Sequence, residues 1–129
     1  MKLKTLTLTA LAGIALTACT TAPKIPQLET GVLQEVHNLD VYPKTTDNKA
    51  RLIKFPGKCI IEFIGNLEAG KSVEQWSFKG LTLISGGTAT FAKDGTSKAT
   101  NFDLHAPDVQ KNFLILRNYF HKNALAQCN

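Results

Sequence analysis

The sequence lacks any strong excess of charge of one sign. Its 129 residues carry 15 Lys and Arg against 10 Asp and Glu. Two of the basic residues, Lys2 and Lys4, belong to the N-terminal leader described below, which leaves 13 basic and 10 acidic residues. Proteins that bind nucleic acid are usually far more basic. Nucleic acid is therefore not an expected partner.

Motifs of known catalytic or metal sites are also missing. The sequence contains no HExxH, HxH, CxxC or GxSxG pattern. The histidines, which are His37, His105 and His121, lie in separate segments and are expected to be structural or exposed. Asp103 and His105 lie two residues apart and could pair, but a hydrolase would still need a placed nucleophile. No metal, cofactor or catalytic residue is predicted, and the domain is expected not to be an enzyme.

The content of apolar residues is that of a folded protein. Hydrophobic residues make up 43% of the chain and charged residues 19%, which is too apolar for a disordered chain. The length allows one domain. We expect a single globular domain over residues 31–129.

The N-terminus has the layout of a secretory signal peptide. Met1-Lys2-Leu3-Lys4 is basic, residues 6–16 form an apolar run, and that run is shorter than the about 20 residues that span a bilayer. The run ends in Leu16-Thr17-Ala18-Cys19, which resembles the lipobox of bacterial lipoproteins. The resemblance covers about the first 19 residues. It implies a signal peptide over 1–18, cleavage before Cys19 and lipid on Cys19. Because Asp does not follow Cys19, it favours the outer membrane.

The remaining cysteines are Cys59 and Cys128. In an oxidising compartment an even pair is predicted to form a disulfide. A metal or redox pair is the alternative, although neither CxxC spacing nor clustered histidines accompany it. Residues 19–30 hold two prolines and little apolar surface, so they are expected to form an extended tether.

Alternating apolar residues predict an antiparallel meander in the domain. Residues 31–42 fit either a short helix or a strand, and residues 43–50 are expected to form a polar loop. The turn dipeptides Pro56-Gly57 and Asp94-Gly95 separate strand-like runs. These runs cover residues 51–55, 59–64, 74–78, 81–84, 88–93 and 97–104.

The C-terminal segment has helical periodicity. Pro107-Asp108 suits a first helical turn, and apolar residues then recur every three or four positions at Val109, Phe113, Leu116, Phe120 and Ala124. The apolar run 113–116 is also compatible with a central strand. We predict an α+β fold in which five or six antiparallel strands carry a C-terminal amphipathic helix, with Cys128 holding the helix end.

One segment matches the phosphate-binding loop of nucleoside triphosphatases. Residues 65–72, from Gly65 through Gly70-Lys71 to Ser72, fit G-x-x-x-x-G-K-[ST]. In that motif a helix follows, whereas residues 73–78 alternate as a strand does, and only 57 residues follow Ser72. The alternative is a connection between two antiparallel strands in which the glycines adopt unusual dihedral angles. We favour this connection.

Two further features concern the charged residues. Glu62 lies within the most apolar strand, and alternation favours its exposure to solvent over a perturbed pKa. The most basic stretch comprises Lys44, Lys49, Arg51, Lys54 and Lys58. It is either a solvated loop and edge strand or a contact patch for an anionic envelope component or an acidic protein.

These observations favour a small lipid-anchored binding module of the bacterial envelope, held to the membrane through Cys19. Its expected partner is another envelope protein or an anionic envelope component. The alternative is a small envelope enzyme or a nucleotide-binding protein that uses Gly65–Ser72. The two differ in what they require, because an enzyme needs a pocket with convergent polar groups.

Overall fold

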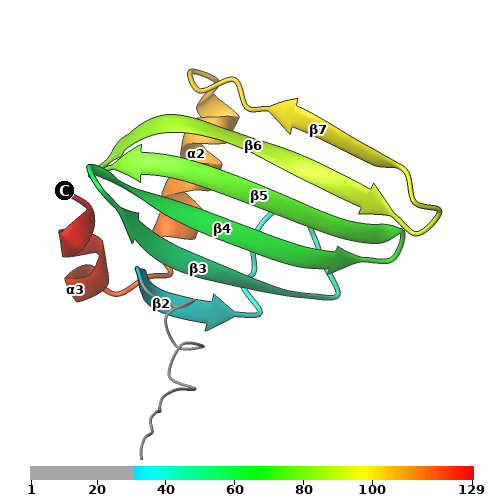
Figure 1. The fold of residues 1–129 in the computed structure, drawn as a ribbon, viewed down its shortest axis with the longest axis horizontal. Coiled ribbons are helices and arrows are strands. Elements are labelled where there is room, and N and C mark those ends of the chain that lie inside the picture. The colour runs from blue at the N-terminus through cyan, green and yellow to red at the C-terminus, as the bar shows by residue number, and fades with distance from the viewer. Residues whose placement is uncertain (1–30) are drawn as a thin grey trace, which may run out of the picture. The chain divides into compact units, whose positions relative to one another are not determined.

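Six antiparallel strands form one sheet whose spatial order follows the order of the chain (Figure 1). The structure is a computed structural model that describes residues Gly31–Asn129, which form one compact unit. The predicted signal peptide (1–18), the lipidation site Cys19 and the tether (19–30) lie outside the described residues. The strands are β2 (Val32–His37), β3 (Asp47–Phe55), β4 (Lys58–Leu67), β5 (Gly70–Lys79), β6 (Thr82–Ala92) and β7 (Ser97–Asn101).

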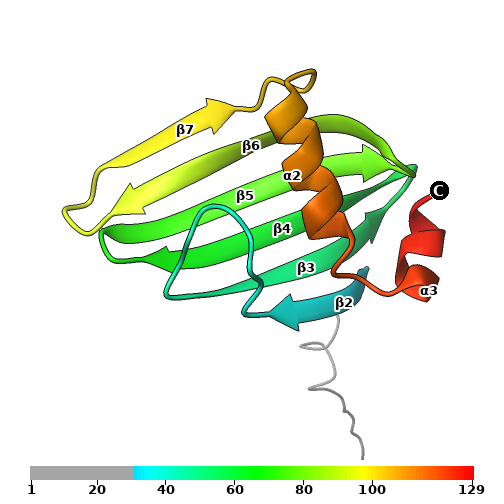
Figure 2. The same ribbon diagram turned by 180° about the vertical axis from the view of Figure 1, so that it is seen from behind.

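Three short helical segments follow the sheet: α2 (Pro107–Arg117), α3 (Lys122–Leu125) and the 3-10 turn η2 (Ala126–Cys128). Helix α2 crosses one face of the sheet (Figure 2). It begins at Pro107, as predicted, because proline needs no N–H partner in the first turn. The fold is therefore mostly antiparallel sheet with a few short helices near the C-terminus, which agrees broadly with the expected α+β class.

Side chains on the sheet face toward α2 form the core. Leu52, Ile61, Phe63 and Phe78 are buried there, and Phe113 of α2 packs edge-on against Phe78 with 5.2 Å between ring centroids. The alternating burial along β3 and β4 gives period-two strands with one covered face. The apolar run 113–116 is thus helical, and its alternative interpretation as a central strand is wrong.

Several predicted boundaries differ from the structure. The ambiguous segment 31–42 contains strand β2. Strand β3 begins at Asp47, so the polar loop predicted for residues 43–50 ends at residue 46 in the structure. The predicted runs 81–84 and 88–93 belong to one continuous strand, β6. The last predicted strand ends at Asn101 rather than at Leu104. The missed strand residues 47–50 and 85–87 are mostly polar or small, which weakens the apolar pattern of a strand. The apolar residues Phe102 and Leu104 instead extend the pattern beyond the end of β7.

The predicted C-terminal helix is interrupted. Helix α2 ends at Arg117, and the amides of Tyr119 and Phe120 then bond three residues back, as in a tightened last turn. The His121 N–H donates to Gln34 Oε1 of β2 at 2.8 Å, which holds the chain against the first strand before α3 begins. This change of direction lets Phe120 enter the core separately from α2.

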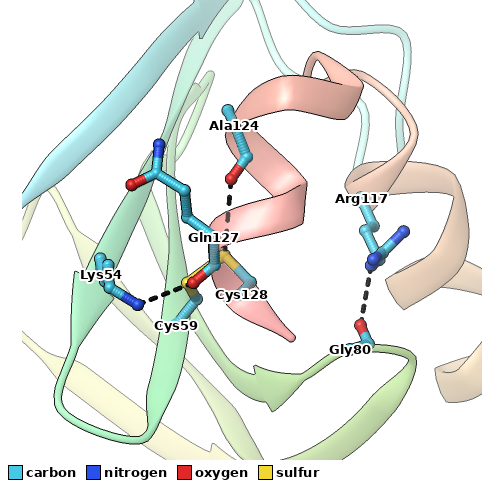
Figure 3. The surroundings of a disulfide bond; sticks show 7 residues. All are labelled: Lys54, Cys59, Gly80, Arg117, Ala124, Gln127 and Cys128. Carbon is cyan, nitrogen blue, oxygen red and sulfur yellow. Dashed lines mark hydrogen bonds between the residues drawn. A yellow bond between two sulfur atoms is a disulfide. The ribbon is translucent and has the colours of Figure 1, made fainter.

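The disulfide between Cys59 and Cys128 joins the start of β4 to the end of the chain (Figure 3). This confirms the predicted pairing. Two further contacts hold the C-terminal region: Lys54 Nζ donates to the Gln127 carbonyl at 2.7 Å, and Arg117 Nε donates to the Gly80 carbonyl at 3.0 Å. The terminal helices are therefore tied to both β3 and the β5–β6 turn.

Candidate functional site

A cavity of about 400 Å³ lies between strand β5, helix α2 and the connection from β2 to β3. This connection, residues 38–46, crosses the same face of the sheet as α2 (Figure 2). We call the cavity the Glu74 pocket. Its lining comprises Asp40, Val41, Tyr42 and Lys44 from the connection, Glu74 and Trp76 from β5, and Asp108, Lys111, Asn112, Ile115 and Leu116 from α2.

The wall formed by the connection is held by one buried amide. Asn48 at the start of β3 accepts from the Leu39 N–H at 2.7 Å and donates to the Leu39 carbonyl at 2.9 Å. Its amide also donates to Thr45 Oγ1 at 2.8 Å. On the other side, the Tyr119 hydroxyl bonds with the backbone N–H and carbonyl of Asp40, both at 3.3 Å. The wall is thus fixed at both ends before any ligand arrives.

Glu74 forms the buried acidic group of the pocket. Glu74, Trp76 and Phe78 are two residues apart along β5, so their side chains point to the same face of the sheet, the one covered by α2. Its relative exposure is 8%, and its Oε1 accepts from the Trp76 indole N–H at 3.1 Å. Trp76 itself packs against Phe102, with ring centroids 4.3 Å apart. The carboxyl group therefore lies beside the aromatic side chain of Trp76 and is almost entirely shielded from solvent.

Burial raises the pKa of the Glu74 carboxyl to about 7, and the hydrogen bond from Trp76 offsets part of that rise. The cause is the loss of hydration, which disfavours the charged form of an acid in an apolar site. Glu74 thus changes charge near neutral pH. A perturbed acid in a cavity is a typical feature of a binding or catalytic site.

Charged side chains surround the mouth of the pocket. Lys44 Nζ lies 3.4 Å from Asp40 Oδ1, and both side chains are almost fully exposed. Asp108 and Lys111 stand on the first turns of α2. Two acids and two bases cancel at the mouth, so the net charge of the pocket depends on Glu74.

The opposite face of the sheet carries a second, broader hollow of about 940 Å³ over β4 to β7. Small residues such as Gly87, Ala89 and Ala99 line much of it. Glu62 lies on this face, where Arg51 donates to its Oε1 through Nε and Nη2 at 3.1 and 2.9 Å. Glu62 thus points away from α2 and forms an ion pair with Arg51.

The segment that resembles a phosphate-binding loop is a β-hairpin. Gly65 to Leu67 end β4, Gly70 to Ser72 begin β5, and these residues pair directly with one another. No helix follows, and Ser72 is buried. Gly70 adopts a φ of +153°, which favours glycine. Gly65 is required for a different reason, which is the lack of space for a side chain. A Cβ there would lie 2.5 Å from Thr45 Cγ2, so Gly65 makes room for the connection that walls the pocket.

The five residues of the predicted basic patch do not share one surface. Lys44 lies at the Glu74 pocket, and Lys54 bonds to the carbonyl of Gln127. Lys49, Arg51 and Lys58 belong to the opposite face, as their strand registers place them. Arg51 is engaged with Glu62. The stretch is therefore basic in sequence but divided between two faces in the structure.

The other candidates are separated in space. Asp103 and His105 lie beyond the end of β7, both exposed, and Asp103 Oδ1 accepts from the His105 backbone N–H rather than from its ring. His37 pairs with Glu35 at 2.7 Å, and His121 is exposed. Across residues 31–129, no group of three or more His, Cys, Asp or Glu side chains could hold a metal ion.

Sequence reasoning missed the two residues that build the pocket. Asn48 falls within the predicted polar loop 43–50, and Glu74 falls within the predicted strand 74–78. The sequence does contain a signal for Glu74, because it lies two and four residues before Trp76 and Phe78, the bulkiest residues of that strand. An acid in register with two large aromatics is expected to face the core.

None of the described helices is long and apolar enough to cross a membrane. No protein-family model, no curated protein and no solved structure matches this chain.

Proposed function

We propose that this protein is a small lipoprotein of the bacterial envelope that binds another envelope component without catalysing a reaction. Lipid on Cys19 would hold it to the membrane, residues 19–30 would act as a tether, and the domain over 31–129 would present its binding site. The outer membrane is the favoured location, because Thr20 rather than Asp follows Cys19.

The observation that carries the binding role is the Glu74 pocket. Preformed pockets with apolar walls and few polar groups are typical of ligand recognition. Here the walls come from Val41, Trp76, Ile115 and Leu116, and the connection that closes them is fixed by Asn48. A wall held in place before binding reduces the entropy lost on association.

The anchor rests on the lipobox Leu16-Thr17-Ala18-Cys19. Each buried CH₂ of an acyl chain contributes about 0.8 kcal/mol, and a single chain binds membranes only marginally. The diacylglyceryl group and the amide-linked chain that the lipobox resemblance implies would together hold the protein stably. A flexible tether then lets the domain search for partners close to the membrane.

The raised pKa of Glu74 favours a second candidate, a small envelope enzyme in which this residue acts as general acid or base. Such a mechanism needs a second reactive group within hydrogen-bond reach. Among residues 31–129, the side chain of Glu74 forms its one hydrogen bond with Trp76. This arrangement suits recognition better than catalysis.

Two measurements test the proposal. Incorporation of labelled palmitate into the full chain, lost in Cys19→Ala, tests the anchor. Cross-linking in intact cells, followed by purification through a tag after Asn129 and mass spectrometry, tests the binding role. A stoichiometric partner that needs Cys19 supports an anchored binding module. A membrane-bound protein that captures nothing under these conditions would refute the protein-binding role and favour the enzymatic candidate.

A further inference from the structure

One oxygen of Glu74 is left without a partner. The Trp76 indole occupies Oε1, whereas Oε2 has no hydrogen bond to any of the residues 31–129. Glu74 lines the pocket while being only 8% exposed. Oε2 is not among the fully buried side-chain polar atoms without a partner in residues 31–129, so it is reached from the cavity that Glu74 lines. An acceptor that is open to a cavity and has no partner in the protein points to a ligand that donates.

The surroundings of Oε2 define the chemistry of that donor. An anion would meet the carboxylate at close range in an apolar site, where like charges repel strongly. A metal ion would need further ligands, and no cluster of suitable side chains occurs in residues 31–129. A cationic donor gains both a hydrogen bond and an ion pair, which is stronger than a bond between neutral groups.

The shape of the cavity adds a second requirement. Its walls are apolar along Val41, Trp76, Ile115 and Leu116, and it holds about 400 Å³. A ligand that fills it therefore carries an apolar stem behind its charged end.

The charged side chains at the mouth of the pocket cancel one another, so Glu74 sets the net charge of the pocket. Asp40, Tyr42 and Lys44 face the pocket from the connection, and Asp108 and Lys111 face it from α2. Lys44 is already paired with Asp40. Because the two acids and two bases cancel, Glu74 determines the sign of charge that the pocket accepts.

We infer that the Glu74 pocket binds an organic cation on an apolar stem, an ammonium or guanidinium group whose charge pairs with the Glu74 carboxylate. This inference rests on the proposed binding function and names its ligand class. Two sources share this chemistry, a lysine or arginine side chain of an envelope protein and a free alkylamine.

The test uses the full chain in a non-ionic detergent with the disulfide intact. The protein has one tryptophan, Trp76, so its fluorescence reports on the pocket directly. At pH 8 we expect saturable fluorescence changes with n-butylammonium or n-butylguanidinium and none with butanoate. Blocked tripeptides with central lysine or arginine distinguish the sources, since binding of the peptides identifies a protein side chain and binding of the amines alone identifies a small molecule.

Two variants make the assignment specific. Glu74→Gln keeps the shape and removes the charge, and it should weaken cation binding at least about tenfold. Glu62→Gln is the matched control, because Glu62 lies on the opposite face of the sheet, and it should leave the affinity unchanged. Equal loss in both variants, retained binding in Glu74→Gln, preference for butanoate, or no saturable binding of any cation would each overturn the inference.

The pH dependence provides a readout that a merely structural role would not give. Cation binding needs the ionised carboxyl, so the affinity should fall about tenfold between pH 8 and pH 6 in the wild type and stay constant in Glu74→Gln. None of the other groups that face the pocket is a histidine. If no cation binds but cross-linking still captures an envelope partner, the inference fails while the proposed function stands.

Discussion

Replacing Glu74 with glutamine should stabilise the domain at neutral and alkaline pH. The pKa of Glu74 lies at about 7 in the folded protein against an ordinary 4.5. A pKa raised by folding means that the folded state favours the protonated acid. Its contribution to stability is present below pH 4.5 and is lost as the pH rises to about 7. Above pH 7 the folded state therefore holds an ionised carboxyl in an apolar site.

The size of the effect follows from the difference between the two pKa values. Each pKa unit corresponds to about 1.4 kcal/mol, so ionised Glu74 costs about 3 kcal/mol of unfolding free energy at pH 8. Glutamine resembles the protonated acid in shape and carries no charge. We expect Glu74→Gln to exceed the wild type by about 3 kcal/mol at pH 8 and by under about 1 kcal/mol at pH 5.

Urea unfolding followed by Trp76 fluorescence measures this difference, with the disulfide oxidised throughout. A gain of about 3 kcal/mol raises the urea midpoint by about 2 M for a domain of this size. Glu68→Gln in the exposed β4–β5 turn is the control and should change stability by less than about 0.5 kcal/mol at either pH. A difference between Glu74→Gln and wild type that is constant from pH 5 to pH 8 would refute the reasoning.

Three further predictions concern the fold and the hairpin. Removing the disulfide with Cys59→Ala and Cys128→Ala together should lower the unfolding free energy by about 4 kcal/mol, because the bond closes a loop with a sequence separation of 69; denaturant unfolding measures the loss, and an unchanged midpoint contradicts it. Gly65→Ala should cost about 1–3 kcal/mol by the same assay, since its Cβ would lie 2.5 Å from Thr45 Cγ2; a neutral result would show that the connection yields freely. Lys71→Ala should leave stability within about 0.5 kcal/mol of wild type, and neither protein should bind a fluorescent nucleotide with Mg²⁺; saturable binding lost in this variant would restore the phosphate-loop hypothesis.

Local sequence signals predicted the sheet well where they were strong. Pro56-Gly57 and Asp94-Gly95 mark two of the turns between antiparallel strands, and Pro107 marks the start of α2. These signals work because each dipeptide or proline restricts the backbone at its own position. The pairing of Cys59 with Cys128 was also predictable, since assigning Cys19 to lipid leaves a single pair.

The connection from β2 to β3 could not be predicted in the same way. Its course depends on Asn48, whose side chain satisfies the backbone of Leu39, nine residues earlier. An asparagine in a polar stretch is normally read as a turn residue, because such side chains often bond to nearby backbone. Asn48 is buried and holds the backbone of Leu39 only because the tertiary structure places this stretch over the covered face of the sheet.

Glu62 and Glu74 show where sequence patterns stop deciding function. Both are acids within alternating strands, and Glu62↔Gln75 and Phe63↔Glu74 are neighbouring pairs of one register, so the two acids point to opposite faces of the sheet. Alternation alone separates the faces but does not say which one a helix covers. The clustering of Trp76 and Phe78 with Glu74 identifies the covered face, and packing by α2 then removes water from that carboxyl. Arg51 supplies Glu62 with a partner, whereas the second oxygen of Glu74 remains open to the pocket, and this difference makes Glu74 the residue on which ligand binding should depend.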